Sequence, residues 1–238
     1  MTDNTKQFRL NLLLTRPLAG SKAFWQVLPH EIGKSLNPIF NPLVEIVPVD
    51  CVPRIEGYAI FTSLNGVENS PKGDGRKAFC VGEMTTKAAV AFGWDALQKG
   101  ETAQQLVIAL SKMPDRTVFT HLAGVHTRGN IAERLSAIGY TASHIAVYDQ
   151  IKCMFSAETN EALASNFPLL VPLFSPRTAR VFADQYSGRS PLHIIALSGD
   201  VANPIRGLDC KTLTVCERPT RNFMVGAVQK VIANMTLS

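Results

Sequence analysis

Side chains able to bind an anion follow several apolar runs in this sequence. The stretch YAIFTSLNGVE, residues 58–68, is apolar as far as Phe61 and then turns polar. Where parallel strands end and helices begin, hydroxyl groups and free backbone N–H groups can bind a carboxylate or a phosphate. The residues in comparable positions are Thr15, Arg16, Ser63, Asn65, Gly82, Thr85, Thr86, Gly124, Thr127, Arg128, Ser175, Arg177, Ser198, Pro219 and Thr220.

The same residue types also have a purely structural use. Ser, Thr and Asn are the preferred N-caps of helices, because their side-chain oxygen accepts a hydrogen bond from a free N–H in the first turn. For any single residue of the set, capping alone is the better interpretation. The set as a whole points more strongly to anion binding than its members do.

Other site chemistries lack their signatures. GVHTRG, residues 124–129, has no P-loop lysine, and neither G-x-G-x-x-G nor G-x-S-x-G follows any apolar run. His121 and His126 do not make a metal set, and the five cysteines show no C-x-x-C pair. The sequence therefore predicts reduced, mostly buried thiols and disfavours a structural disulfide or a zinc site.

Composition narrows the class of protein and of partner. Of 238 residues, 46% are hydrophobic and 18% charged, enough for one large or two small folded domains. The net charge is +5, but the basic residues are dispersed, so we expect a small anionic partner and no nucleic acid. With no signal peptide or membrane-spanning run recognised, we expect a cytoplasmic protein.

The apolar runs read as strands covered on both faces, because they do not alternate with polar residues. They are separated by segments with helical spacing, such as 131–138, which Gly139 ends. Strands alternating with helices predict an α/β fold with a parallel sheet. The predicted strands span residues 10–15, 58–62, 77–81, 117–123, 169–175, 193–198 and 212–217.

Two segments break this alternation. Residues 37–54 contain Pro38, Pro42, Pro48 and Pro53, which exclude a helix and disfavour a central strand. Residues 143–153 also read as extended. Two extended connectors bracketing the residues between them indicate an inserted domain. The similarity of IFTSLNGVE to LFSPRTARVF favours two related lobes.

In order along the chain, several pieces resemble uroporphyrinogen-III synthases. They are LLLTRPLAGSKAFWQVL, IFTSLNGVE, FCVGEMTTKAA, HLAGVHTRGNIAERLSAIGY, VYDQ, LFSPRTARVFA, IALSGDVANPI and ERPTRNFMVGAV. The resemblance implies two similar, doubly wound, flavodoxin-like parallel-sheet lobes. Residues 1–42 with 152–238 would form one lobe and 55–146 the other, with 43–54 and 147–151 as connectors.

The resemblance also implies a reaction and a set of site residues. These enzymes close hydroxymethylbilane to uroporphyrinogen III, with loss of water and inversion of ring D, and use no cofactor. Tyr148 matches the family's tyrosine at the connector and is the expected catalytic residue. Ser63, Thr85, Thr86, Ser175 and Thr220 match positions that line the cleft, with Asn65, Gly82 and Gly124 beside them; Arg16 and Arg128 suit the substrate's carboxylates by type.

Two other functions stay open at this point. One is a two-lobed module that binds an anionic small molecule without chemistry, and the other is a flavodoxin-like domain that binds FMN. Nothing in the sequence resembles a coiled coil, so we expect a monomer.

Overall fold

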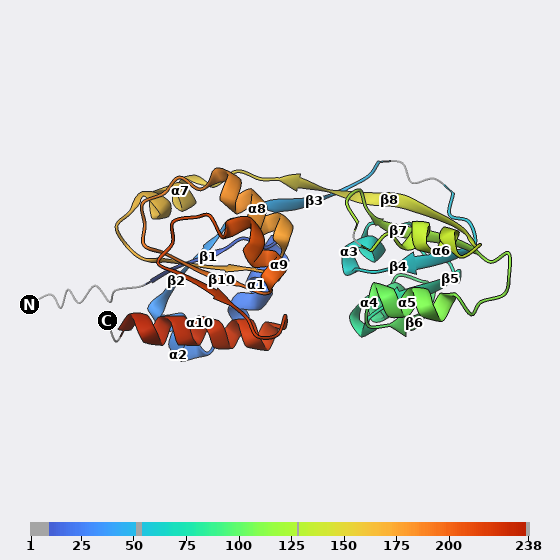
Figure 1. Ribbon diagram of the computed structural model, residues 1–238, viewed down its shortest axis with the longest axis horizontal. Helices are drawn as coiled ribbons and strands as arrows, with labels where there is room; N and C mark the ends of the chain where they lie inside the picture. The colour runs from blue at the N-terminus through green and yellow to red at the C-terminus, as the bar shows by residue number, and fades with distance from the viewer. Residues whose placement is uncertain (1–9, 51–53, 128, 237–238) are drawn as a thin grey trace, which may run out of the picture. The chain divides into compact units, whose positions relative to one another are not determined.

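A computed structural model describes residues 10–50, 54–127 and 129–236, drawn in Figure 1. The chain divides into two compact units. The terminal lobe takes in the residues up to Glu45 and those from Lys152 on, and the inserted lobe is Ile46–Ile151. Each lobe is a sheet between two layers of helices, and its strands are parallel apart from one antiparallel edge strand, Val44–Pro48, in the inserted lobe. The α/β class predicted from the sequence is thus confirmed.

The terminal lobe has a five-stranded sheet in the order β11-β10-β9-β1-β2. Counted along this lobe alone, the order is 2-1-3-4-5, the flavodoxin-like order. Successive strands are added on one side of β1 at first and on its other side from β9 on. We call the place between β1 and β9, where the strand order reverses, the terminal switch point. The strands are β1 Leu10–Leu14, β2 Leu36–Phe40, β9 Leu169–Leu173, β10 Leu192–Ala196 and β11 Thr212–Val215.

Helices cover both faces of this sheet because its strands are apolar on both faces. Leu12 and Leu14 of β1 pack in the core beneath α1, α2 and α10, whereas Leu13 packs in the core beneath α7, α8 and α9. The helices are α1 Leu18–Gln26, α2 His30–Ser35, α7 Ala157–Ala164, α8 Pro176–Gln185, α9 Gly199–Ala202 and α10 Arg221–Thr236, with a 3-10 turn, η1, at Asn203–Ile205.

The inserted lobe has a six-stranded sheet in the order β3-β8-β7-β4-β5-β6. Counted from β4 onward, its order is 3-2-1-4-5, and the strand order reverses between β4 and β7, the inserted switch point. The strands are β3 Val44–Pro48, β4 Tyr58–Phe61, β5 Lys77–Val81, β6 Asp95–Gly100, β7 Val118–Gly124 and β8 Thr141–Lys152.

Two pairs of helices cover this second sheet. α3 and α4 contribute Val67 and Ala89 to the core on one face, and α5 and α6 contribute Leu106 and Ile131 to the core on the other. Their bounds are α3 Leu64–Glu68, α4 Glu83–Ala91, α5 Ala103–Leu110 and α6 Ile131–Ala137.

The proline-rich segment and the second extended segment both contain paired strands. Pro38 lies in β2 and Pro48 ends β3, and both strands are at the edge of a sheet, where a missing N–H is tolerated. The chain passes between the lobes within β3 and within β8, since the divisions fall at residues 45/46 and 151/152.

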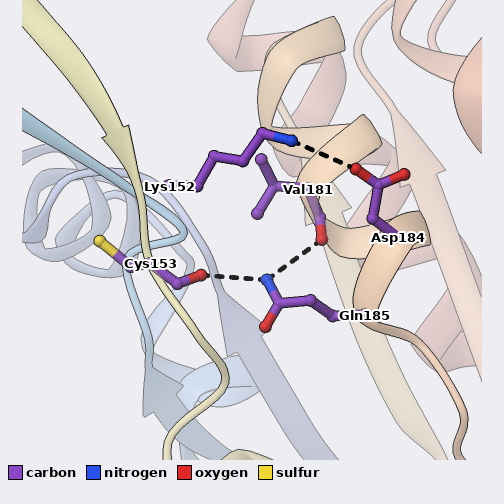
Figure 2. A network of polar contacts seen from close by, with 5 residues as sticks. All are labelled: Lys152, Cys153, Val181, Asp184 and Gln185. Atoms are coloured by element: carbon purple, nitrogen blue, oxygen red, sulfur yellow. Dashed lines mark hydrogen bonds and ion pairs between the residues drawn. The ribbon is translucent and has the colours of Figure 1, made fainter.

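A polar network fixes the chain where it re-enters the terminal lobe (Figure 2). The Gln185 amide donates hydrogen bonds to the carbonyl oxygens of Cys153, at 3.0 Å, and Val181, at 3.2 Å. The Gln185 amide oxygen accepts the N–H of Phe155 at 2.9 Å. One side chain thus ties the segment after β8 to α8, the helix that begins at the terminal switch point.

Candidate functional site

At the terminal switch point the pairing of β1 with β9 stops before either strand ends. The β1–β9 pairs stop at Leu12↔Leu170, whereas the β1–β2 pairs continue to Leu14↔Phe40. Pro172 of β9 follows, and because proline has no amide N–H it cannot extend the ladder. The segments after β1 and β9, which carry Arg16 and Ser175, therefore leave the sheet next to each other.

Arg16 is held in place over an aromatic ring. Its guanidinium carbon lies 4.6 Å from the centre of the Phe174 ring, and Phe174 packs edge-on against Phe24 at 4.9 Å. The Ser21 hydroxyl donates a hydrogen bond to the Arg16 carbonyl at 2.9 Å. Partial burial, and then the nearby Arg221, lower the pKa of Arg16. The site thus holds a half-buried cation beside a second cation.

Arg221 belongs to the same site, although it is not among the residues predicted from the sequence. It is the first residue of α10, and one turn later Met224 packs in the same core as Leu14 and Phe24. This packing brings the start of α10 to the carboxyl end of β1, beside Arg16. The signal that could have found it is the PTR stretch, which puts a cation immediately after a predicted cap, Thr220.

Ser175 and Thr220 begin helices, as capping residues do. The Ser175 hydroxyl accepts the N–H of Thr178 at 3.1 Å and donates to the Thr178 hydroxyl at 2.8 Å. The Thr220 hydroxyl oxygen lies 3.5 Å from the Phe223 amide nitrogen, at the limit of a hydrogen bond. The Ser175 hydroxyl is therefore used within its own helix, whereas the exposed Thr220 hydroxyl is only weakly engaged.

The inserted switch point places Ser63, after β4, near Gly124, the last residue of β7. The Ser63 hydroxyl accepts the Gly66 N–H at 3.2 Å and so caps α3. The structure gives no acceptor for its own hydrogen among the described residues. Asn65 lies in the first turn, where its carbonyl accepts a hydrogen bond from the Asn69 amide at 2.8 Å.

Tyr148 lies in β8, opposite Gly124, where a register shift interrupts the β7–β8 ladder. A Cβ added to Gly124 would stand 2.7 Å from a carbon of the Tyr148 ring, so only glycine lets the ring lie there. The Val125 N–H donates to the Tyr148 carbonyl at 2.9 Å. The side chain is 7% exposed, and no described residue hydrogen-bonds to its hydroxyl.

Two histidines flank this position, and they are not the pair noticed in the sequence. The register pairs His121 with His144, not with His126, and their ring centres are 5.7 Å apart. The His144 Nε2 donates to the Gly124 carbonyl at 3.1 Å, and His121 Nε2 bonds to the Thr62 hydroxyl at 3.2 Å. Burial, and then His144, lower the pKa of His121 to about 4, so its ring is neutral at pH 7.

The start of α4 is less suited to an anion. Gly82 has φ +77°, a conformation that favours glycine, and its carbonyl accepts the Thr86 hydroxyl at 2.9 Å. Thr85 is buried. A carboxylate oxygen of Glu101 lies 3.9 Å from where a Gly82 Cβ would be, and Glu83, paired with Lys87, is in the first turn. These two carboxylates would repel an incoming one. Arg128 lies outside the described residues.

The described part of the chain contains no candidate metal cluster and no candidate membrane span. Its His, Cys, Asp and Glu residues form no group of three or more that could hold a metal ion. No helix within residues 10–50, 54–127 and 129–236 is long and apolar enough to cross a membrane.

Solved structures with the same fold include two synthases. The uroporphyrinogen-III synthetase of Helicobacter pylori aligns with a TM-score of 0.65 at 13% identity, over 94% of this chain and 99% of that one. A mutant uroporphyrinogen III synthase of Thermus thermophilus aligns with a TM-score of 0.53 at 14% identity, over 94% and 99%. At these identities the likeness shows the fold.

The family itself is shown by sequence. A search of curated proteins finds no match. The family model described as Uroporphyrinogen-III synthase HemD matches residues 32–226, most of the chain. The resemblance noticed in the sequence is thereby confirmed: the chain belongs to the uroporphyrinogen-III synthase family, cyclising lyases of tetrapyrrole synthesis.

Proposed function

We propose that this protein closes hydroxymethylbilane to uroporphyrinogen III, with loss of water and inversion of ring D. The observation that carries the proposal is the family match over residues 32–226, which includes Ser63, Gly124 and Tyr148. The arrangement at the two switch points supports it, because donors, cations and a phenol gather where ligands of open α/β sheets bind.

Tyr148 acts as the proton donor in this proposal. The C–O bond of the substrate's hydroxymethyl group breaks, the phenol gives its proton to the departing oxygen, and water leaves. An azafulvene cation remains, and the phenolate takes up a proton again once ring closure has released one. A phenol is a weak acid, so we expect a contribution of about 100-fold, at the low end for general acid catalysis.

Most of the acceleration comes from positioning. The cation is reactive without help, and the outcome depends on which carbon of ring D attacks it. Holding a flexible chain in one geometry can replace a large part of an entropic barrier. The eight carboxylates of the substrate are the handles by which the protein holds it.

We assign carboxylate binding to the residues predicted from the sequence, and we infer from the contacts of each residue how much it contributes. Arg16 and Ser63 carry most, since Arg16 has no acidic partner among the described residues and Ser63 keeps its hydrogen to donate. Ser175 contributes little through its hydroxyl, which Thr178 accepts. The remaining members of the proposed set are Asn65, Gly82, Thr85, Thr86, Gly124, Arg128 and Thr220.

Freshly made hydroxymethylbilane tests the reaction. After incubation with the protein, the products are oxidised and the porphyrin isomers separated by chromatography. We expect isomer III. Isomer I alone, the product of spontaneous closure, would refute the proposal and leave a binding module without chemistry.

The role of Tyr148 is tested by Tyr148→Phe against Tyr58→Phe. Tyr58 is in the same lobe and stacks on Phe79 at 5.1 Å, so its variant controls for loss of a hydroxyl away from the site. We expect Tyr148→Phe alone to lower kcat, with the protein still folded. Equal kcat values for the two variants would contradict the assignment.

The proposal also includes a cofactor-free, monomeric and cytoplasmic enzyme. Dialysis against EDTA should leave the rate unchanged, and strong inhibition reversed by zinc would contradict this. A purified protein without yellow colour is expected, because bound FMN would be visible. Light scattering and cell fractionation check the oligomeric state and the location.

A further inference from the structure

The charged end of the terminal lobe contains two arginines whose charges the fold does not neutralise. Arg16 is half-buried and Arg221 is exposed. The ion pairs found within the described residues join other side chains, and none includes Arg16 or Arg221. Two neighbouring cations without a counter-ion repel each other, and an anion between them would remove that cost.

The position of Arg16 is fixed by packing and not only by charge. Its guanidinium lies over Phe174, which is itself held by Phe24, so one face of the planar group is covered by an aromatic ring. Gly20 lies beside it: a Cβ there would be 3.2 Å from Arg16 Nε. A guanidinium held flat by stacking presents its N–H groups edgewise, as two-pronged binding of a carboxylate requires.

The start of α10 supplies the second half of the arrangement. Met224 fixes this helix in the core beneath β1, and Arg221 is its first residue. α10 has 16 residues, so the partial positive charge of its N-terminus adds to the two guanidinium charges. The geometry therefore concentrates positive charge beside the terminal switch point.

We propose that Arg16 and Arg221 form a clamp that holds one carboxylate group, an acetate or propionate side chain of the linear tetrapyrrole. This inference rests on the proposed function for the identity of the ligand. The clamp assigns a binding role to Arg221 and makes Phe174 the platform that positions Arg16. A phosphate is the alternative anion by charge, but the substrate offers carboxylates only.

Steady-state kinetics with hydroxymethylbilane test the clamp. We expect Arg16→Gln and Arg221→Gln each to raise KM about 10-fold with kcat nearly unchanged, since each removes charge-assisted hydrogen bonds that ground and transition states share. Arg180→Gln is the matched control, because Arg180 is an exposed arginine of the same lobe on α8. Its KM should equal that of the wild type.

The double variant decides whether both arginines hold the same group. If they clamp one carboxylate, Arg16→Gln with Arg221→Gln raises KM by clearly less than the product of the single effects, because either loss alone already disrupts the clamp. Independent sites would give the full product, and this outcome would overturn the proposal. Arg16→Lys, which keeps the charge and loses the fork, should fall between wild type and Arg16→Gln.

Two further results separate the possible failures. Isomer I alone from the wild type refutes the proposed function itself. Isomer III from the wild type together with an unchanged KM in Arg16→Gln and Arg221→Gln refutes the clamp only. Thermal unfolding without ligand shows whether each variant folds, and the inhibition constant of uroporphyrin III, the oxidised product, must change in parallel with KM.

Discussion

The two lobes present chemically different switch points on the same layered plan. In the terminal lobe the groups there are charged: Arg16 over Phe174, with Arg221 beside it. In the inserted lobe the corresponding place holds the Tyr148 phenol on Gly124 and the uncharged ring of His121, which packs against His144. The first place therefore suits the binding of an anion, and the second suits a residue that donates a proton.

The strand orders show that this contrast does not come from topology. The terminal sheet runs 2-1-3-4-5 and the inserted sheet 3-2-1-4-5, yet each reverses next to its first strand, β1 or β4. Equivalent edges thus arise from different strand orders. The segments that follow the strands decide the chemistry, as is general for α/β folds.

Each lobe carries one of the protein's two tryptophans, so the lobes can be followed separately. Trp25 is in α1 of the terminal lobe, and Trp94 is buried in the inserted lobe. Replacing either with Phe leaves a single fluorescent reporter. These two single-tryptophan backgrounds allow the stability of each lobe to be measured separately.

Lowering the pH should produce the largest difference in stability between the two lobes. His121 has its pKa lowered to about 4 in the folded lobe, so the unfolded chain binds the proton first as the pH falls. The stabilisation is present above about pH 6.5 and is lost toward about pH 4, amounting to about 3 kcal/mol at 1.36 kcal/mol per pKa unit. Urea unfolding followed by Trp94 should show this loss.

His121→Gln is the control for the acid effect. Glutamine can keep the hydrogen bond to Thr62 and does not titrate. In this variant the Trp94 transition should change much less over the same pH range. His193 of the terminal lobe also has a lowered pKa, from burial and then Lys211, but it is exposed enough that its effect on the Trp25 transition should be small. Equal acid sensitivity of the two lobes would contradict the prediction.

Gly124→Ala should have the second largest effect on stability, and it tests how the Tyr148 ring is held in place. The new Cβ would lie 2.7 Å from the Tyr148 ring, closer than packed atoms allow. Overpacking of this kind costs about 1–3 kcal/mol, and here it displaces the proposed proton donor, so kcat should fall as well. Gly20→Ala is the matched change in the terminal lobe. Its Cβ would lie 3.2 Å from Arg16 Nε, a less severe approach that a small shift of the guanidinium relieves, and should cost much less.

How far the sequence could predict these features depends on how local each one is. Apolar runs such as 58–61 and 169–173 identified strands, because burial on both faces leaves a mark within a few residues. The short edge strand β6 was missed, since DALQKG is half polar and gains its pairing only from β5. The strand β2 was likewise read as part of a connector.

The candidate site divides in the same way. Ser63 and Ser175 were recognisable, because a cap bonds to an amide three residues away. Arg221 and His144 were not, because each becomes relevant through a partner distant in sequence, Arg16 or Gly124. No pattern within a short stretch indicates which strands will be neighbours, and register alone decided that His121 would meet His144 rather than His126.

A smaller effect is expected from the two serine caps. Ser63→Ala and Ser175→Ala should each destabilise their own lobe by about 1 kcal/mol, the usual contribution of an N-cap. Ser63→Asp and Ser175→Asp keep a capping oxygen but bring negative charge. Because the Ser63 hydroxyl keeps a hydrogen to donate, Ser63→Asp should raise KM for hydroxymethylbilane more than Ser175→Asp does. The reverse order would contradict the contributions proposed here.

The smallest effect should come from the ion pair where the chain re-enters the terminal lobe. Lys152 Nζ lies 3.5 Å from an Asp184 carboxylate oxygen, and both side chains are more than half exposed, at 61% and 55%. Exposed pairs contribute about 0.2–1 kcal/mol and are screened by salt, so Lys152→Met should barely move the Trp25 transition.

Gln185→Leu, which removes the hydrogen bonds to Cys153 and Phe155, should destabilise the same lobe more, by about 1–2 kcal/mol, and independently of salt. If Lys152→Met proved the costlier change at high salt, charge rather than the Gln185 amide would be what secures the segment after β8.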